Sequence, residues 1–385
     1  MNCPVCKSVD VAEFLLIRNI PTTQNLLYKT REEALAALIG DVDLRMCKNC
    51  SFIYNHAFIE EKVVYSADYD NNQSYSDVFK DYISKQIDWL IENYIKKDDV
   101  IAEIGCGKGY YIFELLEKAA SKKVKCGYGF DSTYTGAESV DSINLKYFRN
   151  YYSERYKYIN PNVVILRHVI EHISNPIEFF KPIYESLNEN TILFIETPNV
   201  DWILKNNIIY DFFYEHCSYY NQSSIAKLLE QIGFKILEIK DDFGGQYMWV
   251  VAVVKKTQTK QMFAGGGASN SNYLYNRKLF EENIKKELDN LYSNGINTAL
   301  WGAGAKGITF VNLFDKKNNF IRCLIDINED KKNKYVANTG HIVIPPSDIS
   351  KYGIGKIFIM NANYSCEING ELHRLNLKNI DVEVL

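Results

Sequence analysis

A buried strand that runs through a glycine-rich turn into a helix is the feature that most limits what this chain can fold into. The stretch "VIAEIGCGKGYYIFELLEKAASK" has an apolar run ending at Glu103, three glycines in alternate positions, and then an amphipathic segment. Glycine reaches backbone angles that other residues avoid, and it lets a bound molecule approach the main chain where the helix starts. The pattern therefore predicts a parallel α/β sheet with a ligand-binding turn at Gly105, Gly107 and Gly109.

The next predicted strand places an acid beside this turn. The stretch "VKCGYGF" is followed by Asp131, 24 residues after Gly107, where a carboxylate can bind both hydroxyls of a ribose. The glycine spacing differs from that of dinucleotide-binding proteins, and Glu103 precedes the first glycine. This version resembles motif I of class I S-adenosylmethionine-dependent methyltransferases. The resemblance implies a cofactor site made by the turn, Glu103, Asp131 and the adjacent Ser132.

A segment with two histidines follows the fourth predicted strand, "NVVIL". Taken alone, the residues from His168 to His172 form an H-x-x-E-H sequence, a zinc motif of some peptidases that must lie on a helix. Here a strand runs directly into the motif, which disfavours a peptidase. The segment is similar to the "HVxEH" sequence of the same methyltransferases, which implies that His168 and Glu171 flank the methionine part of the cofactor. The fifth strand, "TILFIETPN", ends with Glu196, Pro198 and the candidate substrate contact Asn199.

Two Cys-x-x-Cys pairs stand near the start of the chain, separated by 40 residues that include the predicted helix "TREEALAALIG". Each pair can supply two thiolates to one metal ion, and two pairs complete a closed tetrahedral site. A redox role would require a βαβ context, which is missing here, and four unrelated free thiols are the remaining alternative. The spacing favours a structural zinc ion bound by Cys3, Cys6, Cys47 and Cys50.

An ionisable pair, Glu215 and His216, stands inside the aromatic run "FFYEHCSYY". A histidine among aromatic rings is often structural, but this pair lies on the insertion expected to cover the cofactor site. Together with the cysteine pairs, the segments "EIGCGKG", "RHVIEH", "IETPN", "YEHCSYY" and "FGG" resemble the C-methyltransferases that act on nucleotide-linked keto-sugars. The resemblance covers nearly the whole chain. It implies that His216 is the catalytic base, that Glu215 supports it, and that Tyr219 lines the sugar pocket.

One position departs from that family, whose members commonly carry "YHEH". This chain has Phe213 where the family tyrosine stands, with Tyr214 beside it as a candidate substitute. Upstream, "SADYDNNQSYSDVF" resembles the family's lid and suggests the pocket residues Tyr69, Gln73, Ser74 and Ser76. His216 would remove a proton from a carbon beside a ketone, or from a hydroxyl, while tyrosine hydroxyls such as that of Tyr69 stabilise the oxyanion. C-methylation and O-methylation therefore both stay open.

A second glycine turn lies in "NTALWGAGAKG", where Gly302, Gly304 and Gly307 follow a predicted strand and open a helix. With Asp326 further on, this is by pattern a dinucleotide fingerprint, so a nicotinamide-dependent oxidoreductase is the rival prediction. Lys306 inside the turn and the family resemblance favour a Rossmann-like domain in which Gly304 and Lys306 hold substrate phosphates. A catalytically silent binding scaffold is a third interpretation, which only the Phe213 departure favours.

Length and composition set the outer limits. A chain of 385 residues with 46% hydrophobic and 24% charged residues is expected to form two or three globular domains. A net charge of −4 and the lack of a long apolar run predict a cytoplasmic protein without nucleic-acid or membrane partners. The family resemblance implies a small-molecule substrate. We expect an α/β fold. It comprises a zinc-binding domain with a tyrosine-rich lid at 1–75, a Rossmann-like class I methyltransferase sheet at 76–256, and a second Rossmann-like α/β domain at 257–385. The expected cofactors are S-adenosylmethionine and zinc.

Overall fold

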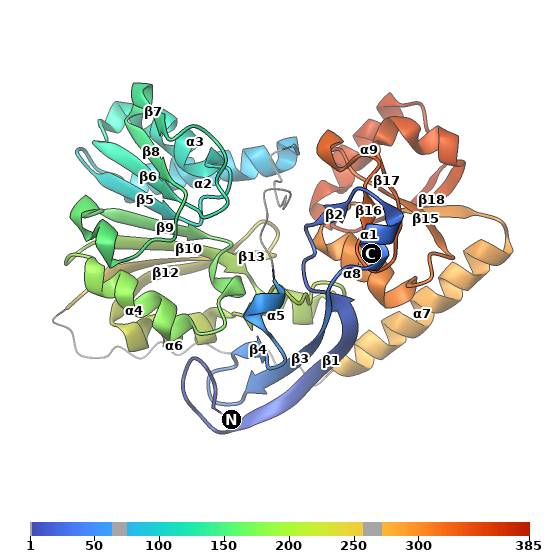
Figure 1. Cartoon of the computed structure of the whole chain (residues 1–385), viewed down its shortest axis with the longest axis horizontal. Coiled ribbons are helices and arrows are strands. Elements are labelled where there is room, and N and C mark those ends of the chain that lie inside the picture. Colours follow the sequence, from blue (N-terminus) through green and yellow to red (C-terminus); the bar gives the residue numbers. More distant parts are fainter. Residues whose placement is uncertain (1, 64–74, 257–271) are drawn as a thin grey trace.

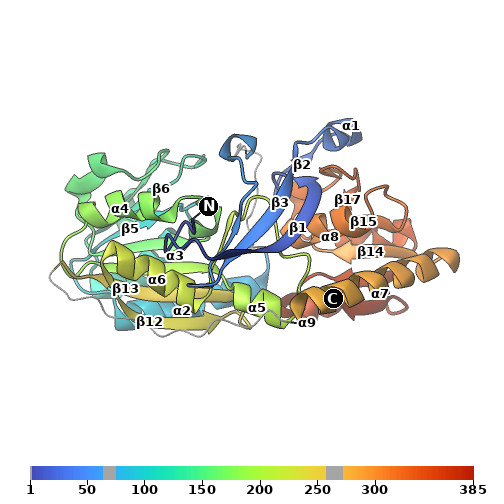
Figure 2. The ribbon, with the colours of Figure 1, turned by 90° about the horizontal axis from the view of Figure 1, so that it is seen from below.

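The computed structural model describes residues 2–63, 75–256 and 272–385. Two α/β lobes lie side by side, and strands from the N-terminal segment run between them (Figures 1 and 2). Most of residues 77–254 build the first lobe, and residues 273–384 build the second. The predicted α/β fold class is confirmed.

The first lobe contains an eight-stranded sheet in the order β12-β13-β10-β9-β5-β6-β8-β7. The strands from β10 to β8 are parallel, whereas β13, β12 and β7 run antiparallel to their neighbours. The central strands are apolar and almost wholly buried, as expected for parallel strands with helices on both faces. Their bounds are β5 (Val100–Ile104), β6 (Cys126–Phe130), β7 (Ser139–Val140), β8 (Leu145–Phe148), β9 (Val163–Arg167), β10 (Ile192–Pro198), β12 (Phe234–Asp242) and β13 (Tyr247–Val254).

Helices cover both faces of this sheet. Helices α2 and α3 pack on one face, and α4 and α6 pack on the other. Helix α6 shows why the ends fall where they do, because Asn221 and Ser224 form a capping box at its start and Gly233 ends it with φ +118°. The bounds are α2 (Asp77–Asn93), α3 (Tyr110–Lys118), α4 (Pro176–Ser186), α5 (Val200–Lys205) and α6 (Gln222–Ile232).

The second lobe has an all-parallel five-stranded sheet in the order β17-β15-β14-β18-β19. The long helix α7 (Tyr273–Ser293) leads into its first strand (Figure 1). The other elements are β14 (Asn297–Trp301), α8 (Ala305–Phe314), β15 (Ile321–Ile325), β16 (Tyr335–Val336), β17 (Val343–Ile344), β18 (Ile354–Ile359), α9 (Ser365–Arg374) and β19 (Asp381–Val384). This lobe is the Rossmann-like unit expected from the second glycine turn.

The N-terminal strands β1 (Val11–Pro21), β3 (Ile39–Cys47) and β4 (Ile53–Asn55) form a sheet that is completed by β11 (Ser218–Tyr219) from the first lobe. Strand β2 (Leu27–Tyr28) pairs instead with β16 of the second lobe. The predicted boundaries at 75 and 256 stay a prediction. Strands of the N-terminal segment pair with strands of both lobes, through β4 with β11 and through β2 with β16.

The helix expected from "TREEALAALIG" is shorter than predicted. Helix α1 (Arg31–Leu35) begins with a capping box between Thr30 and Glu33, and it ends before Ile39 starts strand β3. Pairing of β3 with β1 outweighs the helical preference of this alanine- and leucine-rich segment. Among the described residues, no helix combines the length and the apolar character that crossing a membrane requires.

Candidate active site

A cavity of about 730 Å³ lies between the two lobes, within the range of about 300 to 1,000 Å³ that is usual for small-molecule sites. In the first lobe, β6 and β8 follow β5 in the chain and lie on one side of it in the sheet. The later strands β9 and β10 lie on the other side of β5. The same reversal occurs between β14 and β18 in the second lobe. Open parallel sheets bind ligands beyond the carboxyl ends of the two strands between which the chain switches from one side of the sheet to the other. Residues that follow β5 and β9 in the first lobe, and β14 and β18 in the second, all line this cavity.

The glycine turn of the first lobe faces the cavity. Gly105, Gly107 and Gly109 all have positive φ, at +76°, +54° and +80°. A Cβ on Gly105 would lie 2.3 Å from Val169, and one on Gly109 would lie 2.5 Å from Tyr147, so these two glycines permit close packing. A Cβ on Gly107 would meet nothing within 4 Å, so this glycine leaves open space beside the main chain for a ligand.

The acids of the cofactor motif hold the turn in place. Asp131 accepts the N–H of Gly107 at 2.9 Å and the N–H and hydroxyl of Thr133 at 2.8 and 2.7 Å. Glu103 is buried and accepts the N–H of Ile112 in the first turn of α3 at 3.2 Å. Burial raises the pKa of Glu103 to about 7. Neither Asp131 nor the exposed Ser132 beside it is among the residues that line the cavity, which Asp131 reaches only through its hydrogen bond to Gly107.

A buried charge network lies beneath the cofactor turn. Arg167 pairs with Glu196 at 2.8 Å and stacks over the ring of Tyr111 at 4.2 Å. Glu196 also accepts hydrogen bonds from Tyr82, at 2.6 Å, and from Gln86. Burial alone would raise the pKa of Glu196, but the charge of Arg167 holds it well below its usual range. Sequence reasoning missed Tyr82, Gln86 and Tyr111, because the signal for each is only its burial in the folded chain.

His168 links this network to the cavity. It has φ +52°, which is unusual for a residue other than glycine, and its ring lies 2.9 Å from Glu196 and 3.2 Å from Glu171. Burial alone would lower the pKa of His168, but hydrogen bonds to these two carboxylates raise it to about 9. The same pairing lowers the pKa of Glu171 to about 2 against the effect of burial. His168 and Glu171 therefore form a charged pair at neutral pH.

The histidines of the two family segments meet in the cavity wall. His172 ends a 3₁₀ turn (Ile170–His172), and its ring lies edge to face with that of His216 at 4.9 Å between centroids. Phe213 packs against His216 from another side at 4.8 Å. Burial, followed by the nearby charge of His172, lowers the pKa of His216 to about 3. His216 lines the cavity as predicted, and His172, which the sequence suggested only as the end of a rejected motif, lies beside it.

Three other residues of this segment face away from the cavity. The carboxylate of Glu215 accepts the backbone N–H of Gln24. The hydroxyl of Tyr214 accepts the N–H of Ile59 at 2.9 Å, and that of Tyr219 binds both backbone polar groups of Phe213. None of the three residues lines the cavity, and the polar group of each is hydrogen-bonded to backbone groups elsewhere in the protein. The structure therefore assigns Tyr214, Tyr219 and the Glu215 carboxylate to holding the loop that carries His216.

The remaining predicted pocket residues have different locations. Asn199 caps α5 by accepting the N–H of Asp201, and it donates to Asp241, so it lies in a second hollow away from the main cavity. Ser76 caps α2 at the cavity edge. Three others fall outside the described residues: Tyr69, Gln73 and Ser74.

The glycine turn of the second lobe repeats the geometry of the first. Asp326 follows β15 and accepts the N–H of Ala303 at 3.0 Å, as Asp131 does for Gly107. Helix α8 begins at Gly304 without a side-chain cap, so its first N–H groups are open to an anion. Lys306 lies in the cavity wall, 3.2 Å from Asp211. Both predicted residues of this turn, Gly304 and Lys306, line the cavity.

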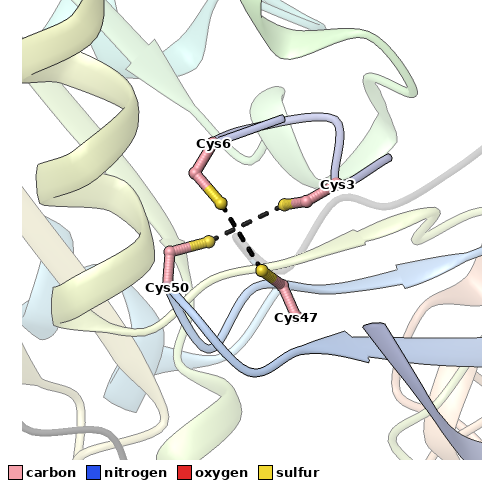
Figure 3. Close-up of side chains that lie close together, drawn as sticks. All are labelled: Cys3, Cys6, Cys47 and Cys50. Carbon is pink, nitrogen blue, oxygen red and sulfur yellow. Dashed lines mark hydrogen bonds between the residues drawn. The ribbon is translucent and has the colours of Figure 1, made fainter. Parts of the chain in front are cut away.

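The four cysteines near the N-terminus converge on one point (Figure 3). The sulfur of Cys3 lies 3.7 Å from that of Cys50, and the sulfur of Cys6 lies 3.4 Å from that of Cys47. Four sulfurs bound to one zinc ion at about 2.3 Å are separated by about 3.8 Å. None of these thiols is in a disulfide, and the donor set fits a closed zinc site.

Two family models match separate parts of the chain. A family model of a methyltransferase domain matches residues 78–239, and one described as C2185-like, N-terminal, matches residues 294–382. The C-methyltransferase NovU of Streptomyces niveus is 23% identical over 245 residues, which covers 62% of this chain and 57% of NovU. A tRNA U34 carboxymethyltransferase of Campylobacter lari is 30% identical over 112 residues, covering 27% of this chain and 37% of that enzyme.

The matched regions thus span less than two thirds of either relative. Among solved structures, an S-adenosylmethionine-dependent methyltransferase from Aquifex aeolicus aligns at a TM-score of 0.33 with 15% identity, covering 47% of this chain and all of that one. The family match and the sheet with its glycine turn define the central part of this chain as a class I S-adenosylmethionine-dependent methyltransferase domain.

We expect the substitution Asp131→Ala to weaken the binding of S-adenosylmethionine by about 2 kcal/mol, or roughly 30-fold. The variant loses charge-assisted hydrogen bonds to the ribose, and calorimetry with the cofactor alone measures the loss. Asp326→Ala is the matched control, because it removes an equivalent carboxylate contact from the turn of the other lobe. Unchanged affinity in Asp131→Ala, or an equal loss in both variants, would contradict the assignment.

Proposed function

We propose that this protein transfers a methyl group from S-adenosylmethionine to a nucleotide-linked keto-sugar, with His216 as the general base. The observation that carries the proposal is the shared cavity, which is lined by the glycine turns of both lobes and by His216. The similarity to the C-methyltransferase NovU and the segments resembling sugar C-methyltransferases support it.

The first lobe would hold the cofactor. Gly107 offers close approach to the main chain, Asp131 offers a carboxylate for the ribose, and the charged pair of His168 and Glu171 lies beside the cavity. When bound, S-adenosylmethionine supplies a methyl group on a sulfonium sulfur, and transfer breaks the S–CH₃ bond with its electron pair kept by sulfur. Positioning the acceptor in line with that bond is the main task of the cavity.

His216 would take the proton that the acceptor atom must lose. Its ring is half-buried in the cavity wall and, with a pKa lowered to about 3, is uncharged at neutral pH, so it has a lone pair available. The lowered pKa also makes it a weaker base than a histidine that titrates near the working pH. The proton leaves a carbon beside the ketone, and the electron pair of that C–H bond forms the new bond to the methyl carbon. On a hydroxyl, the same base would give O-methylation, which is the alternative.

The second lobe would hold the nucleotide part of the substrate. Helix α8 directs uncapped N–H groups into the cavity, and the Lys306 ammonium adds a positive charge beside them. Both features suit a diphosphate. The cation of Lys331, 3.0 Å from Asp326, lines the same part of the cavity.

We expect Lys306→Ala to weaken the binding of a nucleoside diphosphate about 10-fold, with unchanged affinity for S-adenosylmethionine. The probes are UDP and dTDP without sugar, and calorimetry gives both affinities. Lys317→Ala is the control, because Lys317 is an exposed lysine in the turn that follows the same helix. Equal diphosphate affinity in Lys306→Ala and the parent protein would remove the phosphate role.

The function itself is tested with a panel of UDP- and dTDP-linked keto-sugars and S-adenosylmethionine. We expect S-adenosylhomocysteine to form with at least one of them, and NMR of the product to locate the methyl group on the carbon beside the ketone. Methylation on oxygen would select the alternative. Thermal stabilisation by a nicotinamide dinucleotide, but not by S-adenosylmethionine, would favour the oxidoreductase instead.

We further propose that Cys3, Cys6, Cys47 and Cys50 bind a structural zinc ion. The convergence of four sulfurs without an open position supports this role, because catalytic zinc keeps a place for water or substrate.

A further inference from the structure

The cavity contains a second group of side chains whose donor atoms converge. One donor atom each from Glu171, His172 and His216 lies within 4.8 Å of the other two. All three residues line the cavity. Glu171 and His172 come from the 3₁₀ turn after β9, whereas His216 comes from the loop before β11, so only the folded chain brings them together.

The ring of His172 is oriented by the backbone. Its Nδ1 lies 3.2 Å from the carbonyl oxygen of Glu215. A carbonyl only accepts, so Nδ1 carries the hydrogen and the lone pair of the neutral ring lies on Nε2. Donation of one ring N–H to a carbonyl, with the other nitrogen as ligand, is the arrangement that metal-binding histidines commonly show.

The side chains of Glu171 and His216 are also placed so that they can bind a cation. The carboxylate of Glu171 is oriented by the hydroxyl of Thr197 at 3.1 Å and by the ring of His168 at 3.2 Å. The ring of His216 packs edge to face against the rings of His172 and Phe213, and its nitrogens have no hydrogen-bond partner within the part of the chain that the structure describes. The set is therefore one oriented carboxylate and two imidazoles beside open space.

We propose that Glu171, His172 and His216 bind one divalent transition-metal ion, for which Zn²⁺ is the best match. Two histidines and one glutamate form a known donor set of zinc sites with an open fourth position. Donor atoms on one tetrahedral zinc lie about 3.3 Å apart. The three donor atoms here lie within 4.8 Å of one another, and rotation of the half-buried His216 ring brings them to the zinc-bound separation.

The bound ion has a consequence for catalysis. Coordination uses the lone pair of His216 that would otherwise accept the substrate proton, so zinc at this site inhibits methyl transfer. This consequence rests on the proposed function, whereas binding of the ion does not.

The experiment uses the full chain with its cysteine site already filled with zinc. Calorimetric titration with Zn²⁺ is expected to show one further equivalent, and Co²⁺ is expected to give an absorption spectrum of nitrogen and oxygen ligation without sulfur-to-metal bands. Glu171→Gln, His172→Asn and His216→Asn are each expected to weaken this binding by about 100-fold or more. His373→Asn, an exposed histidine on α9, is the control and leaves it unchanged.

Circular dichroism and the thermal unfolding midpoint verify that each variant is folded. The absence of a further equivalent, or equal zinc affinity in all variants, overturns the proposal. Binding that is lost in the variants supports the site even if no sugar is methylated, in which case only the proposed function fails. Methyl transfer that continues at full rate with the site saturated overturns the inhibition by zinc and the role of His216 as base, whereas unchanged zinc affinity in His216→Asn overturns its assignment as a ligand.

Discussion

Replacing His216 with asparagine is expected to lower kcat by about 100-fold or more, while the affinity for S-adenosylmethionine stays nearly unchanged. Asparagine retains a polar group of similar size in the contact with Phe213 and His172, but it cannot accept a proton. Steady-state kinetics with a keto-sugar substrate, measured with a chelator present so that His216 is free of metal, gives kcat. Calorimetry gives the cofactor affinity.

The exposed histidine His56 supplies the matched control, since His56→Asn should leave both quantities unchanged. If His216→Asn loses cofactor binding and turnover together, or unfolds, His216 holds the structure and is not the base. Full turnover in the variant would move the base role to another residue. His172 is then the first candidate, because its ring lies against that of His216 in the same cavity wall.

Removing zinc from the cysteine site is expected to have the largest effect on stability. Structural zinc sites contribute about 10 to 16 kcal/mol of apparent binding free energy, and this free energy is coupled to folding. Cys3, Cys47 and Cys50 are buried in one core cluster with Phe52 and Tyr220, so metal loss should loosen β3, β4 and the adjoining β11. The parallel strands of the central sheet should keep their protection from hydrogen exchange.

Elemental analysis of protein purified without chelator should find one zinc ion that resists dialysis. Hydrogen exchange before and after a strong chelator then maps the loosened strands. Cys50→Ser should lose the ion, whereas Cys366→Ser, which changes an exposed free cysteine on α9, should keep it. Well under one equivalent of metal in the parent protein, or equal zinc content in the two variants, would contradict a structural site.

Features that depend on residues close together along the chain can be predicted from the sequence. The turn from β5 to α3 needs glycines because their φ values are positive, and the acid after β6 lies beside that turn because parallel strands end at one edge. The two Cys-x-x-Cys pairs likewise predict the observed convergence, since each pair forms a local knuckle. These features follow from local geometry and strand periodicity.

The detail of the candidate site was decided by tertiary packing. Glu215 is next to His216 in sequence, yet its carboxylate accepts an N–H from Gln24, 191 residues away, because the N-terminal strands pack against that loop. The hydroxyl of Tyr214 likewise binds the N-terminal segment, at the N–H of Ile59, whereas that of Tyr219 binds backbone groups of Phe213 within its own loop. No local pattern in the sequence reports which face of this irregular loop will meet another strand.

The cavity itself exists only in the folded chain. The sequence by itself determined two strand–glycine–helix units, a cysteine cluster and a histidine beside aromatic rings. Only the tertiary structure decided that both glycine turns face one space, and that His172 and Glu171 meet His216 there. The physical reason is that strand and turn preferences act over a few residues, whereas the position of one lobe against the other depends on long-range pairing such as β2 with β16 and β4 with β11.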